Sequence, residues 1–313
     1  MTIPLPLGGG LYLGWALGAN DAANVFGTAV ASRIISYRRA SILCGGAVIL
    51  GAFVQGQAGI KTLSGLVAQD VNTLVVTSLA AAVTVTAMTA FRLPISTSQA
   101  IVGAITGIGL SGAGMEWNAL GKVITCWVAT PIGALLAACL TSKLLGALLN
   151  NVPMSMLTRD KFLWSGLLVV GTYGSYSLGA NNVANATGIF SGQFEGITDQ
   201  QLALLGGIAI AAGVISFSRR VMMSVGSGIM RLDAFTALVA VLAMSVTIHV
   251  FAVIGVPVST SQGIVGAIVG IGLMRGVNTL RFKVLRDICA GWLLSPLVAL
   301  ILAAAGSAIF IKA

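Results

Sequence analysis

The chain has 313 residues, of which 57% are hydrophobic and only 8% are charged, and its mean hydropathy is +1.00. Soluble globular proteins carry about 25% charged residues, so this composition excludes a soluble enzyme, a disordered chain and a nucleic-acid-binding domain. The net charge of +9 is therefore interpreted as a signal of membrane orientation. Long unbroken apolar runs and 40 glycines favour closely packed helices, and we expect an all-α integral membrane protein.

Ten segments are long and apolar enough to cross a bilayer, which takes about 20 helical residues each. We expect these membrane segments at residues 3–30, 40–60, 71–91, 94–114, 123–149, 162–190, 200–218, 235–256, 257–274 and 288–311. The stretches 71–114 and 235–274 are each compatible with two full spans or with one re-entrant hairpin. The charges do not distinguish these possibilities, because both place the flanking segments on the same side.

The distribution of basic residues predicts the orientation of the chain. With the N-terminus outside, 14 of the 17 Lys and Arg residues lie on the inner side of the membrane and three lie outside. The opposite orientation would invert the positive-inside bias. We therefore predict a multi-pass protein of the plasma membrane with both termini outside.

The chain repeats itself. Three motifs occur twice in the same order, at offsets of 161, 163 and 165 residues: GANDAAN (18–24) and GANNVAN (179–185), PISTSQAIVGAI (94–105) and PVSTSQGIVGAI (257–268), WVATP (127–131) and WLLSP (292–296). Each half holds five expected spans, and an odd number makes the repeats inverted. We predict a first repeat at 1–149, a cytoplasmic linker at 150–161 and a second repeat at 162–313, together one transmembrane domain. Inverted repeats around a midplane site are typical of secondary transporters.

The GANDAAN and GANNVAN motifs place polar residues inside expected spans. Asp21 is the only carboxylate within any of these spans, and a charge at the helix centre costs about 2.5–3.5 kcal/mol. This cost favours a cation ligand or a proton carrier, and the alternative is a structural Asp that pairs with a polar neighbour. Gly, Asn and Asp are poor helix formers, so we expect the helix to break at both motifs. The motif asparagines, which could instead bond neighbouring helices, are Asn20, Asn24, Asn181, Asn182 and Asn185.

The two PxSTSQ motifs place hydroxyl and amide groups directly after a proline. Proline favours a helix start, and a helix N-terminus with free N–H groups attracts an anion. Donors without fixed cations suit an oxyanion that is transported together with its own cations. In the alternative interpretation the hydroxyls simply bond preceding carbonyls. The hydroxyl residues are Ser96, Thr97, Ser98, Ser259, Thr260 and Ser261.

Two further polar residues leave alternatives open. His249 is the only histidine, and it is interpreted as a packing residue rather than a proton relay. Arg92 is an inner-face anchor if 71–114 forms two spans, and it approaches the anion if this stretch is a hairpin. Its repeat mate, Gly255, carries no charge, which favours the anchor.

The ordered motifs resemble those of the PiT family of inorganic phosphate transporters, which also includes sulfate permeases. GANDAANVFGTAV (residues 18–30) is similar to the family signature GANDVANAxGTxV, and GANNVANATG is similar to its second copy. Arg220-Val-Met-Met-Ser-Val-Gly-Ser-Gly-Ile229 is similar to a further family stretch, R-V-x-x-T-V-G-x-x-I. The resemblance implies cation-coupled oxyanion symport with Na⁺ or H⁺, a central anion site and a possible homodimer.

The resemblance assigns roles to the motif residues. It places Asn20, Asp21, Asn181, Asn182 and the six hydroxyl residues in the anion site. It places Asp21, Asn24 and Asn185 at the cation positions, and Asp21 would be the Na⁺ ligand if coupling uses sodium. Gln99 and Gln262 stand at the coupling positions where the family commonly has His, so their role is open.

The departures from the family pattern bear on the substrate. The family commonly has Asp at the position of Asn182. Hydrogen phosphate carries a proton that a carboxylate can accept, whereas sulfate offers only acceptors and loses affinity beside a carboxylate. We expect inorganic phosphate as the substrate, with sulfate as the alternative, and Asn182 predicts fewer coupled cations than in a member with two aspartates.

Other functional classes fit the sequence less well. A membrane enzyme would need a nucleophile with a base or a metal cluster, and the chain has a single His and no GxSxG. An anion channel could also have donor-lined helix ends, but the repeat and Asp21 favour a coupled carrier. We therefore predict that the protein is not an enzyme and has no cofactor. Its expected partners are the anion, the coupling cation and the lipid bilayer, and no nucleic acid.

Overall fold

The computed structural model describes residues 4–90, 95–225, 230, 232–276 and 279–310. These residues form eleven α-helices and no β-strand, which confirms the all-α prediction. The helices are α1 Gly8–Ala31, α2 Tyr37–Gln55, α3 Gln57–Ser64, α4 Val71–Ala90, α5 Thr97–Ile108, α6 Trp117–Asn151, α7 Met156–Thr187, α8 Asp199–Val225, α9 Ala234–Ile254, α10 Thr260–Arg275 and α11 Phe282–Phe310. Short 3₁₀-helices lie at Leu5–Leu7 and Gly188–Phe190, and a π-helix follows α5 at Gly109–Ala113.

Six of the described helices, α2, α4, α6, α8, α9 and α11, are long and apolar enough to cross a membrane. The helices α1 and α7 are also long, at 24 and 32 residues, but they contain the glycine- and asparagine-rich motifs. By contrast α5 and α10 have only 12 and 16 residues, so they extend about 18 and 24 Å at 1.5 Å per residue. Both are shorter than the expected segments that contain or overlap them, 94–114 and 257–274.

Two expectations about helix continuity are wrong. The helices α1 and α7 run without a break through GANDAAN and GANNVAN. The asparagine side chains of these motifs form hydrogen bonds with other side chains or other helices, so they do not compete for their own backbone. The segment 40–60, expected as one span, is divided at Gly56 between α2 and α3. A Cβ at Gly56 would overlap Val183 of α7, so only glycine allows the chain to approach α7 this closely.

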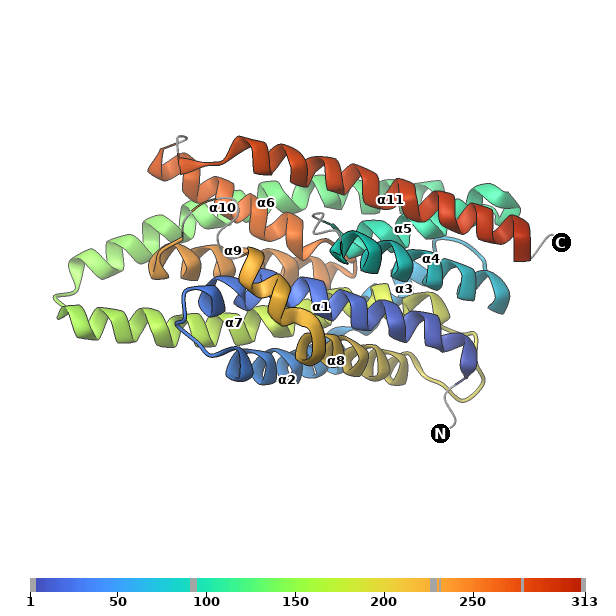
Figure 1. Ribbon diagram of the computed structural model, residues 1–313, viewed down its shortest axis with the longest axis horizontal. Coiled ribbons are helices and arrows are strands. Elements are labelled where there is room, and N and C mark those ends of the chain that lie inside the picture. Colours follow the sequence, from blue (N-terminus) through green and yellow to red (C-terminus); the bar gives the residue numbers. More distant parts are fainter. Residues whose placement is uncertain (1–3, 91–94, 226–229, 231, 277–278, 311–313) are drawn as a thin grey trace.

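The helices pack in reciprocal pairs. The bundle in Figure 1 places α5, α6, α10 and α11 along one side, and α2 and α8 along the opposite side, with α1, α7 and α9 between them. Helix α1 packs on α8 as α7 packs on α2, and α5 packs on α11 as α10 packs on α6. Helix α4 also contacts α1, and α9 contacts α7. Each pairing therefore has a counterpart, formed by the corresponding helices of the other half.

Glycines set the closest contacts between these pairs. A Cβ at Gly103 of α5 would overlap the carbonyl of Pro296 in α11, and a Cβ at Gly266 of α10 would overlap the carbonyl of Pro131 in α6. Small residues of this kind let membrane helices approach backbone to backbone. The same sequence position therefore performs the same packing role in each half.

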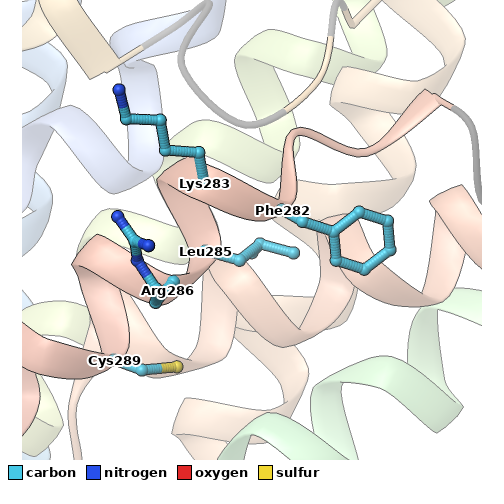
Figure 2. A pocket seen from close by; sticks show the side chains of 5 residues that line it. All are labelled: Phe282, Lys283, Leu285, Arg286 and Cys289. Carbon is cyan, nitrogen blue, oxygen red and sulfur yellow. The ribbon is translucent and has the colours of Figure 1, made fainter.

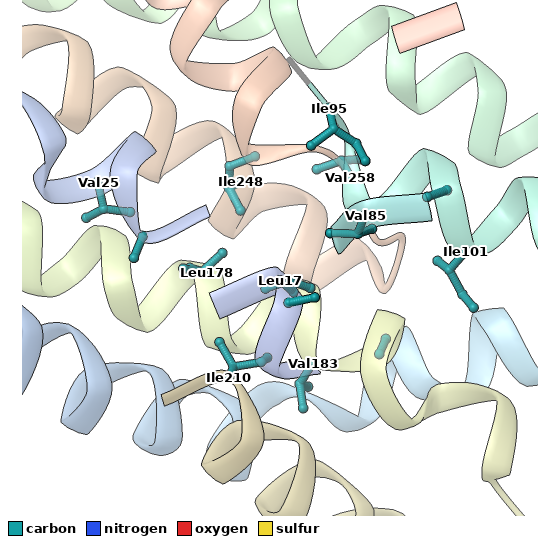
Figure 3. Close-up of a cluster of buried hydrophobic side chains, with 14 of the residues drawn as sticks. Leu17, Val25, Val85, Ile95, Ile101, Leu178, Val183, Ile210, Ile248 and Val258 are labelled. Atoms are coloured by element: carbon teal, nitrogen blue, oxygen red, sulfur yellow. The ribbon is translucent and has the colours of Figure 1, made fainter. Parts of the chain in front are cut away.

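Apolar side chains fill the space around the centre of the bundle. Figure 3 shows Leu17 and Val25 of α1 facing the same core as Leu178 and Val183 of α7. Ile95 and Val258, which each lie just before a short helix, are also buried, at 2% and 0% exposure. The polar motifs are therefore enclosed by hydrophobic residues in the interior.

Candidate functional site

Both STSQ motifs form the N-termini of short buried helices. The Ser96 Oγ accepts a hydrogen bond from the backbone N–H of Gln99 at 3.3 Å, and the Ser259 Oγ accepts one from Gln262 at 3.3 Å. Serine is a preferred N-cap because its side chain satisfies one of the free N–H groups. This geometry confirms the prediction that a helix begins directly after each proline-containing segment, at Thr97 and Thr260.

The two helix starts meet each other in the interior. The Ser98 Oγ donates to the carbonyl of Val258 at 2.9 Å, and the Ser261 Oγ donates to the carbonyl of Ile95 at 3.2 Å. Ser98 is 2% exposed. The sequence repeat therefore reappears as a pair of matching contacts between the two short helices.

Each asparagine-rich motif faces the STSQ motif of the other half. Asn24 in α1 donates from Nδ2 to the Thr260 Oγ1 at 3.3 Å. Asn185 in α7 donates from Nδ2 to the Ser98 Oγ at 2.8 Å, and the Ser98 Oγ lies 3.2 Å from Asn182 Oδ1. These contacts join four segments of the chain into one polar cluster: the α1 and α7 motifs and the starts of α5 and α10.

Asp21 gives this cluster a single carboxylate. Its side chain is 4% exposed, and its Oδ1 accepts a hydrogen bond from Asn20 Nδ2 at 2.8 Å. The Thr260 hydroxyl also faces the carboxylate. Asp21 is the only charged side chain that is buried in the described part of the chain, and every Lys and Arg described there is exposed. The cluster thus contains no fixed positive charge among these residues.

Several buried polar atoms of the cluster have no partner. They include the Thr97 hydroxyl, Asn182 Nδ2 and Asn185 Oδ1. Buried polar groups are nearly always hydrogen-bonded, and an unpaired one costs about 1–3 kcal/mol. The Thr97 hydroxyl and the Asn182 amide can donate to an oxyanion, and the Asn185 oxygen can accept from a protonated group or bind a cation.

Both polar atoms of the Asn181 side-chain amide form hydrogen bonds with the backbone. Its Nδ2 donates to the carbonyl of Val256 at 3.1 Å, and its Oδ1 accepts from the N–H of Val258 at 2.8 Å. The Thr62 Oγ1 at the end of α3 donates to the carbonyl of Gly255 at 2.5 Å. Asn181 and Thr62 therefore fix the extended segment before α10, a positioning function that the sequence did not reveal.

The two other polar residues singled out in the sequence lie apart from these contacts. His249 of α9 lies beside two tyrosines of α7, with ring centroids 5.4 Å from Tyr173 and 5.8 Å from Tyr176, and its Nδ1 has no partner. In the first half the corresponding residue, Thr86, accepts a hydrogen bond from the Tyr12 hydroxyl at 2.8 Å. Arg92 lies outside the described residues.

A surface pocket at the start of α11 is separate from the polar cluster. It is lined by Phe282, Lys283, Leu285, Arg286 and Cys289, as Figure 2 shows. Arg286 forms an ion pair with Asp287, with 3.1 Å between Nη2 and Oδ1. None of the predicted site residues lines this pocket, so it does not extend the cluster.

Two tryptophans were missed as candidates for the site. Trp127 and Trp292 each bury an indole Nε1 that has no partner. They belong to the third repeated motif, WxxTP and WxxSP, which the sequence identified as a repeat without any chemistry attached. The signal that could have found them is the recurrence of a polar aromatic residue beside each short helix.

Comparisons with known proteins give a consistent result. The profile described as "Phosphate transporter family" matches residues 17–167 and 156–303. A protein of Methanocaldococcus jannaschii named "putative phosphate permease" is 30% identical over 302 residues, covering 96% of both chains. The sulfate permease CysP of Bacillus subtilis is 30% identical over 310 residues, covering 97% of this chain and 86% of CysP. A solved structure titled "The sodium-dependent phosphate transporter" has the same fold, with a TM-score of 0.85, 23% identity and 97% coverage of each chain.

Proposed function

The chain belongs to the phosphate transporter family, and from this premise we propose that it carries an inorganic oxyanion across the membrane together with a cation, Na⁺ or H⁺. The family and the fold are those of membrane transporters and not of enzymes, and its apolar helices make it a multi-pass membrane protein. Inorganic phosphate is the proposed substrate. Coupling to a cation is the part of this proposal that depends on the site.

The charge of the buried cluster carries the proposal. An oxyanion brought to Thr97 and Asn182 would lie in the same polar cluster as the Asp21 carboxylate, with no buried Lys or Arg among the described residues to offset the two negative charges. Like charges repel strongly in a low-dielectric interior. A cation or proton at Asp21 removes this repulsion, so binding of the cation and of the anion would be mutually favourable.

The proposed anion site combines the hydroxyl groups of both helix starts with the motif amides. Its residues are Asn20, Asp21, Ser96, Thr97, Ser98, Asn181, Asn182, Ser259, Thr260 and Ser261. The proposed coupling positions are Asp21, Asn24, Asn185, Gln99 and Gln262, with Asp21 as the Na⁺ ligand if sodium is used. Unpaired donors and the N-termini of α5 and α10 support an anion here, because both present hydrogen atoms to the acceptor oxygens of the ligand.

The proposed architecture consists of two inverted repeats, 1–149 and 162–313, joined by the linker 150–161. The reciprocal packing of corresponding helices supports the repeat. The short helices α5 and α10 begin at the buried cluster and are too short to cross the membrane, which supports re-entrant segments within 71–114 and 235–274, although α4 and α9 themselves are long enough to cross it. Termini on the outer face and a homodimer complete the proposal.

Sulfate is the second candidate because of Asn182. A carboxylate at this position could accept the proton of hydrogen phosphate, whereas the Asn182 amide has an unpaired Nδ2 that donates. Sulfate offers only acceptors, so a donor-rich site suits it. A relative named as a sulfate permease, at 30% identity, supports the same alternative.

A binding titration of the purified protein tests this proposal. A ligand that binds only the folded state raises the melting temperature by mass action. We expect phosphate to raise it more in sodium than in an equal concentration of choline, if sodium is the coupling ion, or more at low pH, if the ion is a proton. A shift with sulfate alone would assign the substrate to sulfate, and no shift with either anion under any of these conditions would contradict the proposal.

A further inference from the structure

The third repeated motif lies on the helices that cover the two short ones. Trp292 and Pro296 belong to α11, which packs on α5, and Trp127 and Pro131 belong to α6, which packs on α10. The transport chemistry proposed above gives no role to either tryptophan. Their position beside the STSQ helices suggests one.

Close contacts fix the register of α5 against α11. A Cβ at Gly103 would meet Pro296, and a Cβ at Gly107 would meet Leu300. From the first contact to the second, the residue number rises by four on each helix, so the two helices run parallel with a constant register. One turn earlier on the same faces, this register brings Gln99 to the level of Trp292.

The second half repeats this register. A Cβ at Gly266 of α10 would meet Pro131 of α6, and a Cβ at Gly270 would meet Leu135. Counting back four residues on each helix brings Gln262 to the level of Trp127. Each STSQ glutamine therefore has a tryptophan opposite it on a parallel helix.

The unpaired atoms of these residues are complementary. The Nε1 atoms of Trp127 and Trp292 and the Oε1 atoms of Gln99 and Gln262 are all buried without a hydrogen-bond partner. An indole N–H can only donate, and an amide oxygen can only accept. The register thus places one unpaired donor and one unpaired acceptor at the same level of the α5–α11 contact, and another such pair at the α10–α6 contact. No hydrogen bond joins either pair in this conformation.

We propose that Trp292 and Trp127 are positioning residues, which donate their indole N–H to Gln99 Oε1 and Gln262 Oε1 when the anion is bound. Holding the amide oxygen on the tryptophan side turns the amide NH₂ of each glutamine toward the cluster. The oxyanion then receives donors from both glutamines and no acceptor. This inference rests on the proposed function, because it concerns the same anion site.

Each tryptophan also has another buried, unpaired acceptor on a helix that packs against its own. The Thr89 Oγ1 on α4, which also packs on α11, is buried and unpaired. Its repeat mate is Ala252, which has no hydroxyl. Thr89 could accept from Trp292, and the His249 Nδ1 on α9, which packs on α6, could accept from Trp127. These two acceptors do not correspond in the repeat, whereas a glutamine lies opposite both tryptophans.

Double-mutant cycles on phosphate affinity test the pairing, with the cross pairs as matched controls. We expect Trp292→Phe to raise the Kd for phosphate about tenfold, the effect of one lost buried hydrogen bond. Gln99→Met should raise it at least tenfold, because it also removes the amide donor to the anion. The double variant should be no worse than Gln99→Met alone. Trp292→Phe with Gln262→Met, which the register keeps apart, should multiply to about a hundredfold or more. The pair Trp127 and Gln262 should behave as Trp292 and Gln99 do.

The outcomes separate this inference from the proposed function. If the wild-type protein binds phosphate or sulfate and both the matched and the cross pairs multiply, the pairing is wrong and the transport proposal stands. Coupling of Trp292→Phe to Thr89→Val instead of Gln99→Met would assign Trp292 to Thr89 and also overturn the inference. Failure of the wild-type protein to bind either anion would overturn both.

A measurement on the unmodified protein tests the same pairing if the variants do not fold. The indole N–H vibration in ultraviolet resonance Raman spectra reports hydrogen bonding of tryptophan. We expect saturating phosphate to shift part of this band, since two of the five tryptophans would gain a partner. A band unchanged by bound phosphate would contradict the pairing.

Discussion

The two halves of the chain pack alike but differ in the polar groups they bring to the centre. Gly103 on Pro296 and Gly266 on Pro131 are the same contact made twice, and Ser98 and Ser261 make matching hydrogen bonds to opposite backbone segments. At the equivalent positions 21 and 182, however, one half has Asp and the other has Asn. Backbone contacts tolerate little change, because even one added carbon overlaps the neighbouring helix, whereas a polar side chain can change its charge without moving the helices.

The difference assigns separate tasks to the halves. Asp21 has the only buried charge in the described chain, and its carboxylate accepts a hydrogen bond from Asn20 and faces the Thr260 hydroxyl. Asn182 is neutral, and its Oδ1 lies within hydrogen-bond distance of Ser98 and Asn185 while its Nδ2 has no partner. The first half therefore suits a cation, and the second half suits an acceptor-rich anion.

The largest effect is expected from removing the charge of the first half. Asp21→Asn should reduce cation-dependent uptake about 100-fold or more, since removing one partner of a buried ion pair costs about 3 kcal/mol or more. Initial rates of labelled phosphate uptake into proteoliposomes measure this change. Asp70→Asn, which removes an exposed carboxylate, is the control and should leave the rate unchanged. Equal rates for Asp21→Asn and the wild-type protein would remove Asp21 from the coupling step.

The shared packing predicts equal effects in the two halves. Gly103→Leu and Gly266→Leu should each lower the stability of the protein by about 3 kcal/mol or more, because the added atoms overlap a backbone carbonyl that cannot move aside. Thermal unfolding in detergent measures both. Gly46→Leu is the control, since a Cβ at this exposed position of α2 meets nothing within 4 Å. A large loss in one half and none in the other would show that the two contacts are not equivalent.

Restoring a carboxylate in the second half should sharpen the comparison. Asn182→Asp should shift the preference toward phosphate over sulfate about tenfold, because a carboxylate accepts the proton of hydrogen phosphate and repels sulfate. It should also raise the number of cations transported with each anion. Competition between the two anions and the stoichiometry of uptake measure these changes. An unchanged preference with an unchanged stoichiometry would mean that the residue at position 182 determines neither the anion selectivity nor the number of coupled cations.

A smaller effect is expected at two helix starts that also correspond in the repeat. Asp70 caps α4 by accepting from the N–H of Thr73 at 3.0 Å, and Asp233 caps α9 by accepting from Thr236 at 2.8 Å. Of these two aspartates, only Asp233 has an ion pair with a described residue, which is Arg275 at 2.8 Å. Replacing either aspartate by Ala should cost about 1 kcal/mol, the usual value of an N-cap. Asp233→Ala should cost slightly more, by up to about 0.5 kcal/mol for an exposed pair, and Arg275→Gln should remove that excess.

The pH dependence of these caps has a definite sign. Bonds from the Thr73 side chain and backbone N–H lower the pKa of Asp70. For Asp233 partial burial acts to raise the pKa, but the Thr236 N–H and the Arg275 guanidinium outweigh it and the pKa is lowered. Stabilisation by both caps should be present above the unfolded pKa of about 3.9 and be lost as the pH falls through the lowered values. Melting curves between neutral and acidic pH measure this loss, and equal curves for the wild-type protein and the Ala variants at neutral pH would contradict it.

The all-α membrane character could be predicted from the sequence because long apolar runs with few charges indicate membrane helices, and six of the described helices are long and apolar enough to cross a membrane. The polar motifs and their recurrence also identified the residues that meet in the cluster. Helix continuity at GANDAAN and GANNVAN was predicted wrongly, because propensity describes an isolated helix, whereas here partners on other helices satisfy the asparagines. The pairing of each motif with the opposite STSQ segment, and the function of Asn181 on the backbone of 256–258, depend on tertiary contacts that no local pattern contains.

Uphill accumulation of phosphate in proteoliposomes tests the central claim most directly, with an inward gradient of sodium or of protons as the only driving force. The account predicts that one of these gradients drives phosphate in the wild-type protein above its equilibrium concentration, and that Asp21→Asn allows no accumulation. Phosphate, or sulfate, that merely equilibrates in the wild-type protein under every cation gradient would contradict coupled transport and indicate a channel.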